Sequence, residues 1–570
     1  MLFSVVTCSL LFSTSIHAIL ASSVANSSLR RRDLAVAHTP SGNYAPIHCD
    51  CPKPNILIGA TEQGEAQLIP AEYNYVKEKT ANSIPLWKDY LQRANLSDFN
   101  IEAFLQQAQE RGGLAAETLP NIGFALSGGG ARALCVGGSI LDAFDSRNDK
   151  ANEARVGGIL QLANYAAGSW WRLTEENDLW DWNIAKHYPT VYKVVKKKKE
   201  AGFPVSIVDA WGRLLSRHFI NDGSKDVSRQ GESVLWSSVR QTSSYKERTV
   251  PFILAVAISR PGKRKEFSLE GSPIYEFSPE HFGVCHPYLN ASIPMEYLGS
   301  PSPSFTSNPG ACVQGFDNAG FVMGISSNIF SLGDAPKTHK KKPLFLRLLD
   351  VFISGDDFEG KIPNPFQGLG NAMFQDKDRD MLLMADCGFT HETIPIFTLS
   401  QPARKLDVII AIDSNSDGND PDDFQTLAYP NGTSLFLAYT KTLSPAYKGY
   451  RIPKIPNAID GTFQNLGYNK RPTFFGCNSD PQTPLIIYLP NYYAVAKTNT
   501  LTKEATYEQE EIEGFIRNGF AIATQNAGPT QNSEWPACLA CALIDHQVKR
   551  NGSPRSAQCE ACFKQYCAIG

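Results

Sequence analysis

The stretch IGFALSGGGARALCVGGSILDAFDSR, residues 122–147, decides the fold. Its first five residues form a short apolar run, which predicts a buried β-strand that stops at Gly128, Gly129 and Gly130. The residues after the glycines have helical spacing. A strand that passes through a glycine turn directly into a helix is typical of α/β proteins.

Four more apolar runs predict buried strands, at residues 252–258, 381–385, 408–412 and 485–489. The stretches between them are long enough for helical crossovers. Residues 508–525 have acidic residues near their start and helical apolar spacing, which predicts an amphipathic packing helix. We therefore expect an α/β fold with a central sheet and helices packed on its faces.

The amino-acid composition indicates which class of protein this is. With 42% hydrophobic and 19% charged residues in a chain of 570, a large globular core is expected. The formal net charge of −3 gives no general attraction to nucleic acid or to an anionic membrane. We expect no nucleic-acid partner, and any lipid contact has to be local.

The first residues predict export. Residues 1–25 hold a short apolar run followed by small residues, as in a signal peptide, and residues 26–44 form a polar segment that suits a propeptide. Residues 45–570 are expected to form a single large domain with a cysteine-rich end. The last residues carry no hydrophobic tail, so neither a GPI anchor nor a transmembrane anchor is expected.

Cysteines and sequons agree with secretion. Removal of Cys8 with the signal leaves twelve cysteines, an even number. The C-terminal cluster of two Cys-x-x-Cys pairs has spacing that would suit zinc, but export favours disulfides. Glycosylation sequons begin at Asn26, Asn95, Asn290, Asn431 and Asn551.

The glycine loop is a candidate anion site. Three glycines before a helix let a ligand approach backbone N–H groups at the positive end of the helix dipole, which suits an oxyanion or a phosphate. No Gly-Lys-[Ser/Thr] follows, so a Walker loop is not expected. A tight turn without a ligand is the alternative, and Arg132 in the first helical turn favours the anion site.

The catalytic partners are less clear from pattern. Asp386 follows the apolar run 381–385, which we expect to be a central strand of the sheet, at the edge where ligands of open α/β sheets bind. It could act as general base for a serine, although local pattern alone favours an ordinary turn or helix-cap aspartate. No G-x-S-x-G occurs, and Ser169 and Ser326 are the nearest candidate nucleophiles. Lys196 to Lys199 and Lys340 to Lys342 predict solvated surfaces, and His391 with Glu392 lacks the second histidine of a metal site.

Several motifs together resemble the fungal lysophospholipase or phospholipase B family, whose catalytic domain is related to the animal cytosolic phospholipases. They include SGGGARAL, YEFSPEHFG, GFDNAGFVMG, MADCG and QCEACFKQYC. The resemblance covers most of the chain and implies a patatin-like fold. It also implies hydrolysis of phospholipid acyl esters by a serine–aspartate dyad without cofactor or metal.

The resemblance assigns roles residue by residue. Gly128, Gly129, Gly130 and Arg132 take the oxyanion and phosphate-recognition roles, and Asp386 takes the role of the base, with Cys387 where the family has glycine. The family's nucleophile segment resembles YLAGLSGGSW. This chain has the shorter YAAGSWW at residues 165–171, where Ser169 is the substitute nucleophile.

The leading hypothesis is an extracellular lysophospholipase acting on phospholipids and lysophospholipids at a lipid or micelle surface. One competing hypothesis is a catalytically impaired lipid-binding relative, or a truncated gene model, because the segment around Ser169 is shortened. For the chain as it stands, the shortened segment predicts weak or no release of fatty acid from lysophosphatidylcholine. A phosphate-binding protein that uses the same loop is a third hypothesis.

Overall fold

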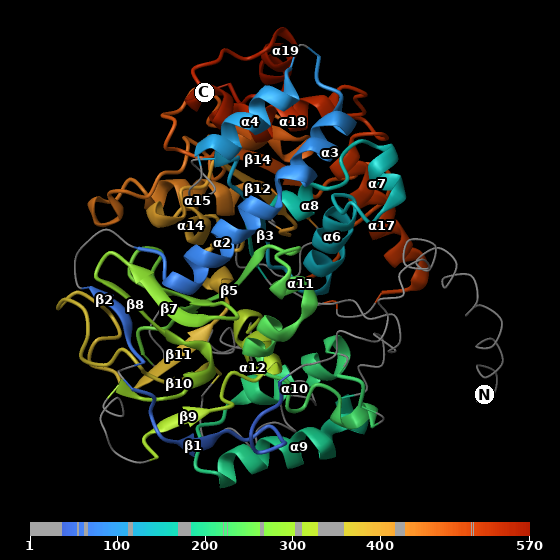
Figure 1. Cartoon of the computed structure of the whole chain (residues 1–570). Coiled ribbons are helices and arrows are strands. Elements are labelled where there is room, and N and C mark those ends of the chain that lie inside the picture. The colour runs from blue at the N-terminus through green and yellow to red at the C-terminus, as the bar shows by residue number, and fades with distance from the viewer. Residues whose placement is uncertain are drawn as a thin grey trace, which may run out of the picture.

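A computed structural model describes residues 37–53, 56–61, 67–97, 99–111, 118–168, 184–220, 222–224, 226–262, 267–302, 310–328, 358–416, 428–502, 504 and 507–569. A long mixed sheet crosses this part of the chain (Figure 1). In spatial order its strands are β13 (Thr473–Phe475), β14 (Leu485–Pro490), β12 (Val408–Asp413), β3 (Ile122–Leu126), β4 (Tyr165–Ala167), β5 (Phe252–Ser259), β6 (Ile274–Phe277), β7 (His281–His286), β8 (Leu289–Pro294) and β2 (Ile58–Thr61).

The centre of the sheet is parallel. Strands β14, β12, β3, β4 and β5 all run the same way, so their carboxyl ends lie along one edge. The five strands predicted from apolar runs are all present. One of them differs from expectation: β11 (Met381–Ala385) is not a central parallel strand, because it runs antiparallel to β5 and pairs on its other side with β10 (Gly360–Pro363). The predicted α/β class is confirmed.

Alternation along the parallel strands fills two cores. Phe124 of β3 packs with Ile410 and Ile412 of β12 into one core, while Ala125 and Ile409 pack into the other. The first core is covered by α3 (Ile84–Ala94), α4 (Ile101–Arg111), α6 (Gly130–Asp142), α8 (Ile159–Leu162), α17 (Gln509–Thr524), α18 (Trp535–Arg550) and α19 (Ala557–Tyr566). The second is covered by α2 (Pro70–Asn82), α11 (Ser243–Lys246), α14 (Ile396–Leu399), α15 (Thr433–Lys441) and α16 (Thr462–Asn465).

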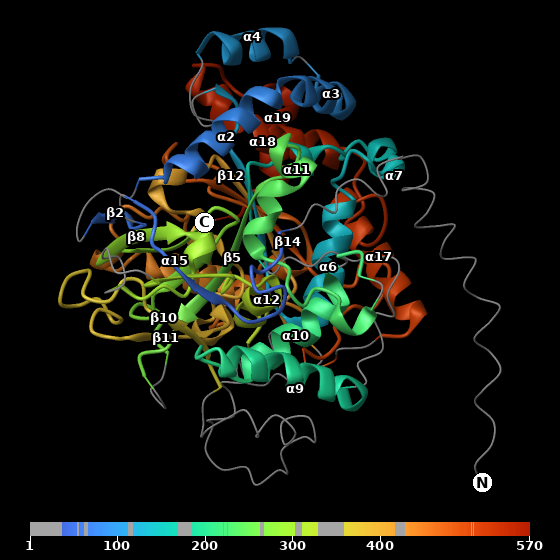
Figure 2. The same ribbon diagram turned by 60° about the horizontal axis from the view of Figure 1, so that its bottom comes forward.

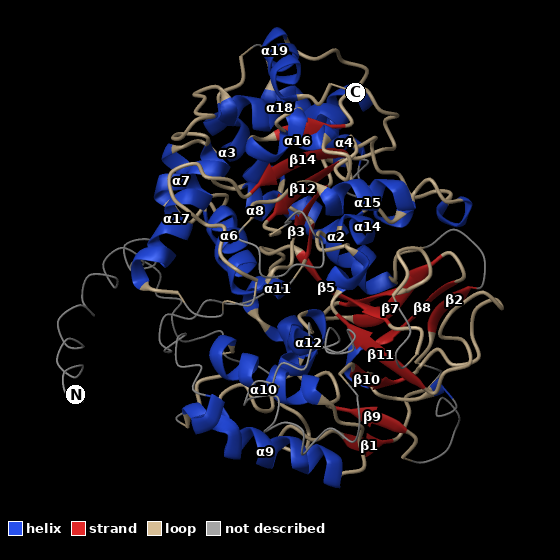
Figure 3. Ribbon diagram, turned by 180° about the vertical axis from the view of Figure 1, so that it is seen from behind, coloured by secondary structure: helices blue, strands red, loops and turns tan. Residues whose placement is uncertain are grey.

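The antiparallel part of the sheet has its own core. Strands β6 to β8 pack with α9 (Ile184–Glu200), α10 (Ile207–Phe219) and α12 (Ala319–Ser326), and Figure 2 shows α9 and α10 at the outside of this layer. Figure 3 shows the two halves of the sheet from behind. The lysine run on α9 was expected to be solvated, but Lys198 is buried and bonds Asp209 at 2.6 Å. Asp209 balances its charge, which makes the burial tolerable.

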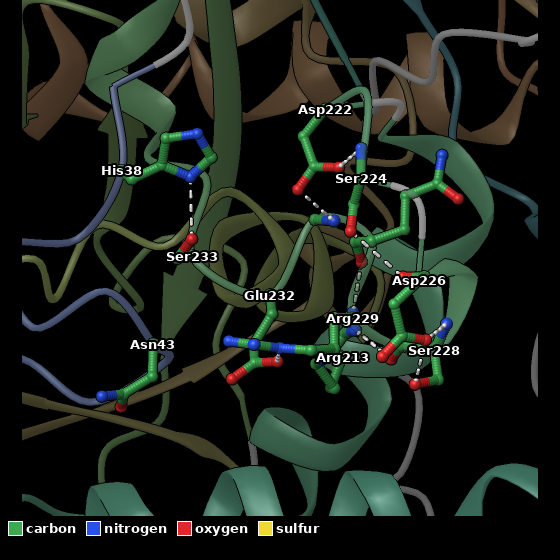
Figure 4. A network of polar contacts seen from close by, with 12 residues as sticks. His38, Asn43, Arg213, Asp222, Ser224, Asp226, Ser228, Arg229, Glu232 and Ser233 are labelled. Atoms are coloured by element: carbon green, nitrogen blue, oxygen red, sulfur yellow. Dashed lines mark hydrogen bonds and ion pairs between the residues drawn. The ribbon is translucent and has the colours of Figure 1, made fainter.

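Part of the polar N-terminal segment packs on the body of the protein. His38 Nδ1 lies 2.8 Å from Ser233 Oγ (Figure 4), and the Thr39 N–H donates to the Ser233 carbonyl at 2.7 Å. Tyr44 is buried and its hydroxyl donates to Asp209 at 3.0 Å. The signal peptide expected at residues 1–25 lies outside the described residues.

The connection after α10 is organised by Arg213. Its guanidinium is buried and donates to the carbonyls of Gln230 and Ser228, both at 2.8 Å. Asp222 accepts the Ser224 and Gly231 N–H groups in the same network (Figure 4). These bonds fix the connection to which His38 is bound.

Four disulfides cross-link the described residues. Cys51–Cys312 joins the region of β1 (Ile47–Cys49) to β9 (Cys312–Gln314), a separate antiparallel pair. The C-terminal cluster forms disulfides rather than a thiolate zinc site. Its bonds, which tie α18 to α19 and the chain end to the region of β13, are Cys538–Cys562, Cys541–Cys559 and Cys477–Cys567. Of the described helices, none combines the length and apolarity needed to cross a bilayer.

Candidate active site

The glycine loop joins β3 to α6 in a conformation that requires glycine at two positions. Gly129 has φ +135° and Gly130 has φ +70°, both in the region that side chains disfavour. A Cβ on Gly130 would lie 2.5 Å from the Thr502 carbonyl oxygen, and one on Gly129 would lie 2.7 Å from the Arg132 guanidinium. The glycine loop is therefore closely packed against Thr502 and the Arg132 side chain.

The three glycine N–H groups differ in their partners. The Gly128 N–H donates to the Thr393 carbonyl at 2.8 Å, so it is already used within the fold. For the N–H groups of Gly129 and Gly130, the described part of the chain supplies no acceptor. Both stand at the start of α6, where helix N–H groups lack intrahelical partners and the helix dipole is positive. Two adjacent backbone donors are thus available for an anion.

Arg132 faces the protein rather than an open site. Its side chain is 1% exposed, and its Nε donates to the Ser414 carbonyl at 2.8 Å. Its Nη1 donates to the Thr500 carbonyl at 2.6 Å, and both terminal nitrogens lie 3.2 Å from the Thr502 hydroxyl. The guanidinium fork therefore ties the glycine loop to two neighbouring loops.

The carboxyl end of β4 lies beside the glycine loop. Gly168, the first residue after this strand, donates its N–H to the carbonyl of Leu254 in β5 at 3.0 Å. A Cβ on Gly168 would lie 2.7 Å from the Leu126 Cβ at the end of β3, so only glycine fits. Ser169 follows Gly168 in the sequence and lies outside the described residues. The alternative candidate, Ser326, sits on α12 and donates to the Met323 carbonyl at 3.1 Å.

Asp386 follows β11 and caps the short helix η6 (Cys387–Thr390). Its carboxylate accepts the Gly388 N–H at 2.7 Å. Burial raises the pKa of Asp386 to about 6, and the Gly388 N–H opposes this rise by stabilising the charged form. A carboxylate with a pKa near neutrality is suited to accept and return a proton.

Cys387 fits its position without backbone strain. It stands where the family pattern has glycine, but its φ is not positive and its side chain is buried in the second core. Burial raises the pKa of its thiol well above the ordinary value. The substitution therefore leaves the turn after Asp386 intact and adds a packed, protonated thiol.

Thr393 and Asn415 join the aspartate turn to the glycine loop, and the sequence interpretation missed both. Besides accepting the Gly128 N–H, Thr393 has its methyl carbon 3.4 Å from the position of a Cβ on Gly388. The Asn415 amide donates to the Thr393 hydroxyl at 2.6 Å. Asn415 follows β12, so the rule that drew attention to Asp386, a polar residue after a buried strand, could also have found it.

The residues at the end of β12 also bond to the glycine loop. The Ser414 N–H donates to the Ser127 hydroxyl at 2.6 Å, and the Asn415 N–H donates to Asp413 at 3.0 Å. The loop residue Ser127 is therefore bound to the neighbouring strand as well as to β3. In the described part of the chain, no group of three or more His, Cys, Asp or Glu side chains has the arrangement of a metal site.

The predicted glycosylation residues lie in different settings. Asn95 is exposed at the end of α3. Asn290 lies inside β8, paired with β7 and β2, and lines a small polar pocket with the buried Ser292 of its own sequon. Asn431 and Asn551 are partly exposed, and the side-chain Oδ1 of Asn431 accepts bonds from the Thr433 N–H and hydroxyl.

The chain was compared with known families and structures. The model of the lysophospholipase catalytic domain matches residues 122–175 and 175–570. A lysophospholipase of Arthroderma benhamiae is 34% identical, over 94% of this chain and 87% of that protein. Lysophospholipase 2 of Aspergillus fumigatus is 33% identical, over 94% of each chain, and lysophospholipase 1 of Candida albicans is 31% identical, over 94% and 90%.

Among solved structures, human GIVD cytosolic phospholipase A2 is similar, with a TM-score of 0.62 at 15% identity. The alignment covers 87% of this chain and 69% of the human protein, and it supports the patatin-like catalytic fold. The family match, by contrast, spans most of the chain and includes the glycine loop and the Asp386 turn. The chain belongs to the lysophospholipase family of phospholipid hydrolases.

Proposed function

We propose that the protein is a secreted lysophospholipase that releases fatty acids from lysophospholipids and phospholipids at a lipid or micelle surface. The observation that carries the proposal is the bond from the Gly128 N–H to the Thr393 carbonyl, because it holds the glycine loop against the turn that follows Asp386. The end of β4, which leads into Ser169, lies against the end of β3 at the same loop. The relatives named lysophospholipases support the choice of substrate.

In the proposed reaction the Ser169 hydroxyl attacks the acyl carbonyl while Asp386 accepts its proton. The N–H groups of Gly129 and Gly130 stabilise the negative charge that develops on the carbonyl oxygen. Asp386 then returns the proton to the departing alcohol, and a water molecule hydrolyses the acyl-enzyme by the same route. Arg132 acts by fixing the loop through Ser414 and Thr500.

A second candidate function has its own support. The family model matches in two stretches that meet at residue 175, close to the shortened segment YAAGSWW. A nucleophile turn depends on its neighbouring glycines, so loss of residues there would leave the glycine loop and Asp386 without a working serine. The protein would then bind lipid without hydrolysing it.

Release of fatty acid from lysophosphatidylcholine by the purified chain decides between the two. The lysophospholipase proposal expects release that Ser169→Ala abolishes and Asp386→Asn lowers at least about a hundredfold. Ser326→Ala, the matched control on α12, keeps full activity. No release from a folded chain that still binds phosphatidylcholine vesicles would establish the second candidate, whereas a longer transcript whose product is active would restore the lysophospholipase.

Export is proposed from the signal-like start, and the disulfides are compatible with it. Expression in a fungal host tests it directly. The proposal expects the protein in the medium and a loss of mass on glycosidase treatment that Asn95→Gln reduces. A protein that is retained in the cytosol and unaffected by glycosidase would contradict it.

A further inference from the structure

The loop at residues 491–502, between β14 and α17, carries an exposed row of side chains. Tyr493 is 54% exposed and Val495 is 39% exposed, and Lys497 is exposed beside them. Tyr492, just before the row, and Ala494, within it, are buried in the first core. Alternate residues thus place an aromatic, an aliphatic and a basic side chain on the outside of one loop.

The fold holds this row in place. The buried Asn518 of α17 accepts three successive N–H groups with its carbonyl oxygen, those of Ala494 at 3.0 Å, Val495 at 3.0 Å and Ala496 at 3.2 Å. Its amide group donates to the Tyr492 carbonyl at 2.8 Å. An asparagine saturated in this way fixes the loop backbone, so Tyr493 and Val495 are held outward.

The same loop continues to the active site. Seven residues after Tyr493, the Thr500 carbonyl accepts a bond from Arg132, and the Thr502 carbonyl lies against Gly130. Helix α17, which carries Asn518, packs against α6 (Figure 1). The exposed row and the glycine loop therefore belong to one continuous structural unit.

We propose that Tyr493, Val495 and Lys497 dock the protein on the surface of a zwitterionic phospholipid aggregate. Tyrosine and an aliphatic side chain gain free energy at the boundary of headgroups and acyl chains, and a lysine there keeps its charge near the phosphates. The net charge of −3 provides no long-range attraction to a lipid surface. Docking therefore depends on a local apolar contact of this kind.

The occupant is a lipid surface rather than another protein. Three side chains on one loop cover far less than the roughly 800 Å² per partner that stable protein interfaces bury. A lipid surface needs no shape-matched partner, and a few inserted side chains suffice for reversible binding. The inference rests on the proposed function, since it explains how a protein with this site meets substrates held in an aggregate.

Vesicle binding tests the docking without requiring turnover. We expect Tyr493→Ser/Val495→Ser to sediment with phosphatidylcholine vesicles about tenfold more weakly than the unaltered chain. The matched control is Leu443→Ser, because Leu443 is 63% exposed and follows α15 by two residues, and Figures 1 and 3 show α15 and α17 on opposite sides of the molecule. An unchanged melting temperature checks that each variant is folded.

Kinetics separate this inference from the proposed function. The double variant should lose activity on micellar lysophosphatidylcholine and keep it on a short-chain phosphatidylcholine below its micelle concentration. Equal vesicle binding by the double variant and the unaltered chain would overturn the docking, as would a change in oligomeric state instead of lipid binding. Normal docking without hydrolysis of either substrate would overturn only the proposed function.

Discussion

The Gly128 N–H donates to the Thr393 carbonyl oxygen at 2.8 Å, and this bond joins the two halves of the candidate active site. Asp386 and the glycine loop come from distant parts of the chain and from strands of opposite direction. Thr393 accepts the Gly128 N–H, its methyl group lies beside Gly388 in the turn after Asp386, and the Asn415 amide donates to its hydroxyl. The relative position of base and oxyanion donors therefore depends on Thr393.

Replacement of Thr393 by valine should lower kcat by about tenfold with little change in KM. Valine keeps the shape of threonine but leaves the buried Asn415 amide without its acceptor. This lowers the free energy of unfolding by roughly 1–3 kcal/mol and weakens the link between the Asp386 turn and the glycine loop. Steady-state kinetics on lysophosphatidylcholine measure the effect. Thr393→Ser keeps the hydroxyl and should retain most of the activity; equal losses for valine and serine would show that the hydroxyl has no positioning role.

The glycine at position 130 should be irreplaceable for activity. In Gly130→Ala the methyl group meets the Thr502 carbonyl and the backbone is held at φ +70°, so the loop has to move. Displacing an oxyanion donor typically costs at least about a hundredfold in kcat. Gly137→Ala is the control on the same helix, because its Cβ meets only Leu126 at 4.0 Å. That variant should stay active and be slightly more stable.

The sequence predicted what depends on local pattern. The apolar runs located all five expected strands, and the strand–glycine–helix motif located the loop, because burial and backbone freedom leave direct marks on composition. The antiparallel direction of β11 was not predictable, since an apolar run has the same appearance in either direction. Thr393 was missed because its link to the glycine loop is made by its carbonyl, which any residue type supplies.

The contacts of Arg132 were likewise not predictable from the sequence. An arginine in the first helical turn suits a phosphate, and that role stays a prediction; the sequence did not show that the guanidinium also binds the Ser414 and Thr500 carbonyls, which lie 282 and 368 residues away along the chain. Only tertiary structure brings these oxygens to it. Likewise, four lysines in a row gave no sign that Lys198 would be buried, because the sequence does not show which face of α9 meets Asp209.

Replacement of Arg132 by lysine distinguishes loop support from phosphate recognition. Lysine keeps the charge but lacks the planar fork, so buried carbonyls lose their donors and unfolding should become easier by roughly 2–4 kcal/mol. If Arg132 supports the loop, activity falls by the same factor on lysophosphatidylcholine and on a phosphate-free monoacylglycerol. A loss confined to the phospholipid would assign the guanidinium to the phosphate instead.

Asp386 should make activity and stability respond to pH in opposite directions. Its pKa is raised by burial to about 6, and the base has to be ionised, so kcat/KM should fall as the pH drops below about 6. Between the ordinary aspartate pKa of about 3.9 and this value, the folded protein binds more protons than the unfolded chain. Stability from this residue is therefore lost as the pH rises through that window, and the ionised carboxylate is a net cost above it.

Asp386→Asn removes this half-buried charge while its amide oxygen can still accept the Gly388 N–H. We expect the variant to be inactive but more resistant to urea than the unaltered chain at about pH 7.5, with the difference vanishing near pH 4. Asp378→Asn, at an exposed position between β10 and β11, is the matched control and should show no such dependence. A variant less stable than the unaltered chain at about pH 7.5 would mean that the ionised carboxylate supports the fold, and the acid limb of the activity would then need another residue.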